Sequence, residues 1–208
     1  MRRLTLVLLA FGLLAAGPAD GKQRCRGVRH CAAVGHHGHP IRPASVGTTT
    51  PTAGASPATG PCTDGDLMIA TETIARAAAS ALCLVNAQRT ANGVAPLAED
   101  SRLDAAALAH LSDMVAGNYF AHTSPSGVPF TRWLTDAGFA GPYPMGENIA
   151  VGTSTLSTPE SIVNAWMSSP GHRANILDAG YHRTGMGAVA TAVTLPGDGG
   201  TYAQEFGG

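Results

Sequence analysis

Residues 146–177, GENIAVGTSTLSTPESIVNAWMSSPGHRANIL, predict one strand followed by two short helices. The glycine-flanked apolar run at the start of this stretch is typical of a strand. Thr158 and Pro159 then provide a cap and a first helical residue, and Ser169 and Pro170 repeat the same arrangement eleven residues later. The stretch therefore predicts a domain in which a strand and helices are neighbours in the chain.

Two longer helices are predicted before this stretch and a pair of strands after it. Residues 66–91 are Ala-rich, lack Gly and Pro, and carry apolar side chains at helical spacing. Residues 101–117 carry one apolar face, and either Asp100 or Ser101 can cap this helix. Residues 184–206 predict two strands, 184–195 and 201–206, joined by a PGDGG turn. This order of elements predicts an α+β domain with an antiparallel sheet packed against helices.

The first 61 residues differ from the rest in composition. Residues 1–19 begin with two arginines, continue with 13 largely apolar residues and end in small residues, which is typical of a secretory signal peptide. A membrane span needs about 20 apolar residues, so we expect no transmembrane segment once the signal is removed. Residues 20–61 lack aromatic residues and are rich in Gly, Pro, Ser and Thr, which predicts a disordered leader. We therefore expect a secreted, extracellular protein whose folded domain spans residues 62–208.

The net charge of −1 is the sum of unlike segments. Residues 62–208 carry six arginines against 13 carboxylates, whereas residues 20–61 carry five basic residues against one aspartate. An acidic domain lacks the basic face that phosphate contacts require, so we expect no nucleic-acid partner. The basic leader also holds four histidines beside two cysteines, which indicates either a metal-binding tract or a small disulfide loop.

Export makes disulfides the expected state of the four cysteines. Four cysteines allow three pairings. Proximity along the chain favours Cys25 with Cys31 and Cys62 with Cys83. The second bridge would clamp the end of the leader onto the first helix.

Three polar residues in loops or at the ends of elements are the candidates for chemistry: His122, Glu147 and His172. Two neutral imidazoles can bind a divalent metal, and a carboxylate can orient one ring or activate a bound water. Signatures of nucleotide enzymes and of α/β-hydrolases are missing from the sequence. His110 lies on the apolar face of the second helix, so we interpret it as a hydrogen-bonded core histidine, and Ser124 has no evident base.

Six segments, in this order, resemble the CAP superfamily (cysteine-rich secretory proteins, antigen 5 and pathogenesis-related 1 proteins) in its bacterial SCP-like branch. They span about 125 residues from Leu82 to Phe206 and read LVNAQRTANGVAPL, LAHLSDMVAGNYFAHTSPSG, GENIAVG, AWMSSPGHRANIL, RTGMGA and YAQEFG. The resemblance implies a three-layer α-β-α sandwich with a small antiparallel sheet between helices. Asn86 and Arg89 match the family's N-x-x-R pattern, and we expect them to fix the first helix against the loops.

The resemblance also implies a groove lined by two histidines and two glutamates, in which zinc or another divalent cation can bind. By motif, His122 and His172 match the two histidines and Glu147 matches the first glutamate. Ser169 stands where the second glutamate is expected, which removes one carboxylate from the set. We therefore take His122 and His172 as candidate metal ligands.

Three functions are compatible with these features. The favoured one is a secreted binding or interaction module, and not an enzyme, whose extracellular ligand is a lipid, a glycan, a cell-wall polymer or a protein. The alternative is a peptidase-like, zinc-dependent hydrolase with His122 and His172 as ligands and Glu147 as the catalytic base. Two protein ligands are fewer than the three usual in catalytic zinc sites, which counts against hydrolysis. A third hypothesis is a structural envelope protein tethered by its basic leader to anionic polymers.

Overall fold

The computed structural model describes residues 6–7 and 61–208. The helices are α1 (Ile74–Ala91), α2 (Ser101–Gly117), α3 (Phe130–Asp136), α4 (Pro159–Ser168) and α5 (Pro170–Leu177), with a short 3₁₀ helix at Ser154–Ser157. The strands are β1 (Leu6–Val7), β2 (Ala98–Glu99), β3 (Met145–Thr153), β4 (Arg183–Val189) and β5 (Gly199–Gly207). Within this part of the chain, no helix combines the length and the apolarity needed to cross a membrane.

The strands form one sheet in the order β1-β3-β5-β4-β2. Its centre is antiparallel, as predicted, because β5 lies between β3 and β4 and pairs with both in opposite direction. The two outer pairs were not predicted: β1 runs antiparallel to β3, and the two-residue β2 runs parallel to β4. The long central pairing places Glu147 of β3 directly opposite Glu205 of β5.

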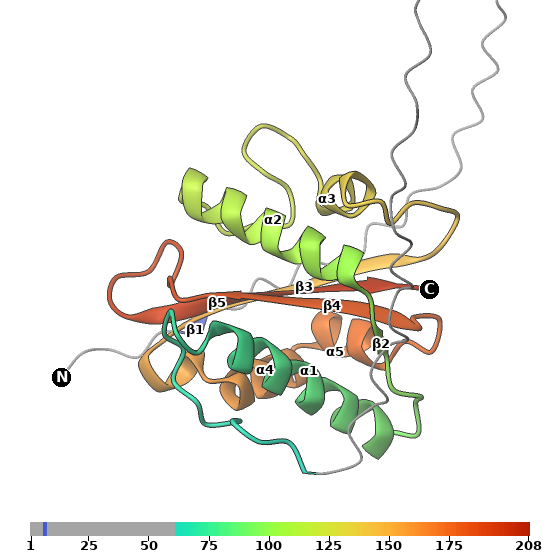
Figure 1. Ribbon diagram of the computed structural model, residues 1–208, viewed down its shortest axis with the longest axis horizontal. Helices are drawn as coiled ribbons and strands as arrows, with labels where there is room; N and C mark the ends of the chain where they lie inside the picture. Colours follow the sequence, from blue (N-terminus) through green and yellow to red (C-terminus); the bar gives the residue numbers. More distant parts are fainter. Residues whose placement is uncertain (1–5, 8–60) are drawn as a thin grey trace, which may run out of the picture. The chain divides into compact units, whose positions relative to one another are not determined.

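Helices cover both faces of this sheet (Figure 1). The pair α2 and α3 lies on one face, and α1, α4 and α5 lie on the other. Successive side chains of a strand point to opposite faces of the sheet, so alternate residues pack against the two helical layers. Ile149 and Ala203 pack with residues of α2, whereas Ala150 and Tyr202 pack in the larger cluster that contains Trp166 of α4. The predicted three-layer α-β-α sandwich is therefore confirmed.

The observed start of α2 agrees with the sequence-based prediction, whereas that of α1 does not. Asp100 is the cap of α2 and accepts a hydrogen bond from the backbone N–H of Arg102. The start predicted for the first helix at residue 66 is wrong, because α1 begins at Ile74. Thr73 is the reason: its hydroxyl accepts from the N–H of Ala70 and donates back to carbonyls of the same turn, which holds a non-helical turn before the helix.

Two further predictions, the cap of α5 and the end of β4, differ from the structure. Ser169 lies at the cap position of α5, as predicted, but its side chain accepts no capping hydrogen bond. The strand predicted over 184–195 ends at Val189. Beyond it, the Thr201 hydroxyl accepts from the N–H of Val193 and donates to the carbonyl of Thr191, so side-chain hydrogen bonds replace the ladder there.

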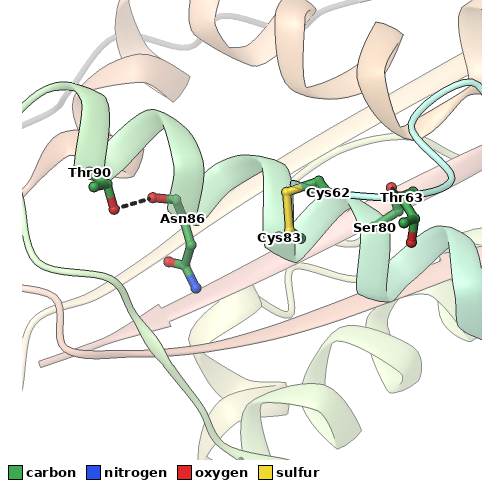
Figure 2. Close-up of a disulfide and its surroundings, with 6 residues drawn as sticks. All are labelled: Cys62, Thr63, Ser80, Cys83, Asn86 and Thr90. Atoms are coloured by element: carbon green, nitrogen blue, oxygen red, sulfur yellow. Dashed lines mark hydrogen bonds between the residues drawn. A yellow bond between two sulfur atoms is a disulfide. The ribbon is translucent and has the colours of Figure 1, made fainter. Parts of the chain in front are cut away.

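Cys62 and Cys83 form a disulfide that joins the coil before α1 to the middle of that helix (Figure 2). Beside it, the Ser80 hydroxyl donates a hydrogen bond to the carbonyl of Thr63. This pairing is the one that chain proximity favours. Cys25 and Cys31 lie outside the described residues, as do the predicted leader, up to residue 60, and all of the predicted signal peptide except Leu6–Val7.

Replacing both cysteines, Cys62→Ala with Cys83→Ala, should lower the free energy of unfolding by about 3 kcal/mol. The bridge joins residues 21 positions apart, and releasing that loop raises the entropy of the unfolded chain. Urea unfolding of the oxidised chain and of the double variant measures the difference. The unsubstituted chain under reducing conditions is the control and should lose the same amount. Equal stability of the oxidised chain and the variant would contradict a stabilising bridge.

Candidate functional site

Glu147 is at the centre of a buried polar cluster on the α2 side of the sheet. Its Oε1 lies 2.6 Å from Nδ1 of His122 and its Oε2 lies 2.5 Å from Nδ1 of His110. Burial opposes ionisation of this carboxyl, yet the hydrogen bonds and the charges of the two rings together outweigh it and lower the pKa of Glu147 below its usual value. Both carboxylate oxygens are therefore engaged by imidazole N–H groups.

His122 reaches this carboxylate from the loop between α2 and α3. The loop is held by an isolated bridge between Thr123 and Pro129, and the carbonyl of His122 accepts a hydrogen bond from the N–H of Phe130. The side chain of His122 is 27% exposed, so one edge of the ring faces solvent while Nδ1 faces Glu147. A proton on Nδ1 leaves the lone pair of Nε2 available to a ligand.

His172 enters from α5, the helix on the other side of β3. Its carbonyl accepts from Nδ2 of Asn148, and Asn175 donates to the backbone carbonyl of Glu147, so α5 is tied to the strand that carries the carboxylate. Nδ1 of His172 is buried and has no hydrogen-bond partner in the described part of the chain. Burial, followed by the charge of His122, lowers the pKa of His172 to about 4. The ring is therefore neutral at neutral pH.

Ser169, three residues before His172, has a buried hydroxyl that finds no partner among the described residues. Its position before Pro170 predicts a cap for α5, but it accepts no capping hydrogen bond. A small, unpaired oxygen thus occupies the position at which the resemblance places a second glutamate.

The sequence did not identify two residues of this cluster, His110 and Glu205, as members of the site. His110 is fully buried and hydrogen-bonded, as predicted, but its partner is Glu147, which spacing alone does not indicate. Glu205 lies opposite Glu147 and is fully buried, with no hydrogen-bond partner for either oxygen in the described region. Burial and the neighbouring charge of Glu147 raise the pKa of Glu205 well above its usual range. Only the strand register, which the sequence does not specify, brings the two carboxyls together.

Other candidates are placed outside this cluster. The Ser124 hydroxyl pairs with that of Ser126 and accepts from the N–H of Val128, so no base activates it. His182 is exposed. A cavity of about 450 Å³ lies at the C-terminal end of α2, against the loop of residues 191–196, and none of the candidate residues lines it. The polar cluster and not this cavity is therefore the candidate site.

Comparison with known proteins supports the assignment of the fold. Two curated relatives from Bacillus subtilis match: the uncharacterized protein YkwD, 40% identical over 125 residues, and the uncharacterized membrane protein YlbC, 33% identical over 106 residues. The matches cover 59% and 51% of this chain but only 44% and 30% of the relatives. The chain therefore spans less than half the length of these relatives.

Solved structures show the same architecture. An extracellular protein containing an SCP domain from Bacillus anthracis superposes with a TM-score of 0.55 at 24% identity, over 66% of this chain and 43% of that one. An outer surface protein of Borrelia burgdorferi superposes with a TM-score of 0.50 at 18% identity, over 61% of this chain and 87% of that one. The sequence model of the cysteine-rich secretory protein family, CAP, matches residues 82–194. The chain thus belongs to the cysteine-rich secretory protein family.

Proposed function

We propose that this chain is a secreted binding module in which His122 and His172 hold a divalent cation, such as Zn²⁺, that contacts an extracellular ligand. The observation that carries the proposal is the hydrogen bond from Nδ1 of His122 to Glu147. It fixes the tautomer and orientation of the ring, as carboxylates do for metal-binding histidines, and leaves Nε2 free to coordinate.

The chemistry of the donor set fits such a cation. His172 supplies a neutral ring with a buried, unpartnered nitrogen, and neutral imidazole is a good ligand for zinc. The Ser169 hydroxyl nearby in the chain is also unpartnered. Two protein ligands leave coordination positions open, which suits contact with an outside molecule. Two neutral ligands also leave the positive charge of the cation uncompensated, which favours a ligand with a carboxylate or phosphate group.

Hydrolysis is less well supported by the same geometry. Glu147 is 4% exposed and both of its oxygens accept hydrogen bonds from imidazoles, so this carboxylate positions His122 and is shielded from a water in the groove. Ser124 has no base within its hydrogen bonds. A binding function requires neither group to react.

Secretion is part of the proposal. The signal-like N-terminus and the Cys62–Cys83 disulfide support an oxidising, extracellular location. The Bacillus anthracis and Borrelia burgdorferi proteins, by their names, are extracellular and on the outer surface. A lipid, a glycan, a cell-wall polymer and a protein all remain eligible as the ligand, because each can supply an anionic group.

Zinc affinity tests the proposed groove site. The four leader histidines, His30, His36, His37 and His39, are first replaced by glutamine, since they can bind metal on their own. In this leader-substituted chain, His122→Ala with His172→Ala should weaken zinc binding at the groove by at least about 100-fold, because both protein ligands are lost. Isothermal titration at pH 7 measures the affinity.

The matched control is His182→Ala in the same leader-substituted chain. His182 is exposed and lies outside the polar cluster, so zinc affinity should not change. Equal affinity of the leader-substituted chain and the His122/His172 double variant would eliminate the groove site.

A further inference from the structure

Beneath the groove, a second set of potential metal ligands is enclosed in the protein. His110 of α2, Glu147 of β3 and Glu205 of β5 each offer a ligand atom, and these atoms lie within 4.8 Å of one another. His110 and Glu205 have no exposed surface, and Glu147 is 4% exposed. The ring of Trp133 stacks on His110 at 4.0 Å between centroids and covers it from α3.

Apolar clusters flank this triad along α2. One apolar cluster contains Leu111, which follows His110 in α2, together with Ile149 of β3. A second contains Leu103, two turns before His110 in α2, together with Leu134 of α3. Within the described residues Glu147 pairs with His110 and His122, and no arginine forms an ion pair with either glutamate of the triad. Two adjacent carboxyls in such a place cannot both stay charged unless a cation compensates them.

Either a proton or a metal ion can compensate the negative charges of Glu147 and Glu205. The buried atoms that lack a hydrogen-bond partner distinguish the two. Both oxygens of Glu205 are buried without a hydrogen-bond partner in the part of the chain that the structure describes, and Nδ1 of His110 is the ring nitrogen that faces Glu147. One proton shared between the glutamates would satisfy a single oxygen of Glu205 and leave its other oxygen unpaired. A divalent cation accepts several lone pairs at once and cancels two negative charges.

We propose that His110, Glu147 and Glu205 form a buried structural site for a divalent transition metal. One imidazole and two carboxylates suit zinc, manganese or iron(II). The site is distinct from the groove, where His122 and His172 are the ligands, and it does not depend on that function. It does share Glu147 with the groove, since the same carboxylate orients His122. The buried metal would thus fix the carboxylate that positions the groove histidine.

The test uses the leader-substituted chain with His172→Ala added, which disables the groove but leaves the triad and its hydrogen bonds intact. The chain is refolded with Zn²⁺, passed through a desalting column and analysed for zinc by mass spectrometry. We expect about one equivalent of zinc per chain and a melting temperature that falls when a chelator is present during refolding. Glu205→Gln in this background should retain no zinc and show no effect of chelator.

Glu160→Gln is the matched control, since Glu160 is exposed on α4 and lies outside the triad. It should retain the full equivalent. Zinc-free protein from the refolded His172→Ala chain would overturn the proposal, even if Glu205→Gln does not fold. A folded Glu205→Gln variant with unchanged melting temperature and zinc content would overturn it in favour of a shared proton, which glutamine mimics. Failure of the groove site alone leaves this result unchanged, because the two experiments remove different ligands.

Discussion

Arg89→Met should lower the free energy of unfolding by about 4 kcal/mol. Only 1% of Arg89 is exposed, and its guanidinium donates to four backbone carbonyls, those of Ala95, Ile176, Asp178 and Tyr181. These carbonyls belong to the loop after α1 and to the chain around the end of α5. Methionine fills a similar volume but leaves the acceptors without donors, and each buried, unsatisfied acceptor costs about 1 kcal/mol or more.

Chemical denaturation of the Met variant against the unsubstituted chain measures this loss. The control is Arg173→Met, because Arg173 is exposed and, among the described residues, its side chain makes one hydrogen bond, to Asn92. The control should unfold at the same denaturant concentration as the unsubstituted chain. Equal midpoints for the Arg89 variant and its control would refute the role of Arg89 as the link between α1 and these loops.

Gly185→Ala should be the other large effect, a loss of at least about 3 kcal/mol. Gly185 of β4 lies directly under α2, and a Cβ there would overlap the backbone of Leu103 and Asp104. A helix backbone cannot yield as a side chain does, so α2 must move off the sheet. That shift would also disturb the hydrogen bond from the N–H of Met186 to Asp104.

Gly187→Ala, two residues along the same strand, is the control for this prediction. Its nearest neighbour would be Cδ1 of Leu111 at 2.9 Å, the end of a flexible side chain. The loss there should stay below about 2 kcal/mol. Thermal unfolding of both variants ranks them, and a control that is more destabilised than Gly185→Ala would contradict the close approach of α2 to β4.

The sequence specifies most of the helices because their signals are local. Asp100 before an apolar face predicts the start of α2, and Thr158 before Pro159 predicts that of α4, where its hydroxyl accepts from Ser161. The start of α1 was missed because a threonine hydrogen-bonding pattern competes with a helical composition there. The two-residue β2 was missed since it owes its conformation to pairing with β4 and not to its own residues.

The sequence predicts three residues of the candidate site and misses two that are fully buried, His110 and Glu205. His122, Glu147 and His172 follow from motifs of the family that the sequence resembles, and the structure links His122 directly to Glu147. Glu205 could not be found in this way, because a carboxylate in a strand is normally a solvated residue. Its burial depends on the register that sets it against Glu147 and on α2 above it, and both are properties of the tertiary fold.

The most direct test of the groove as a metal site is a crystal of the leader-substituted chain soaked in Zn²⁺, with anomalous scattering recorded at the zinc edge. We expect a peak bound to a ring nitrogen of both His122 and His172, at a distance of about 2.0–2.1 Å from each. Glu147 should keep its hydrogen bond to Nδ1 of His122 in that crystal. A crystal with zinc in the solution but no peak between these two histidines would rule out the groove as a metal site.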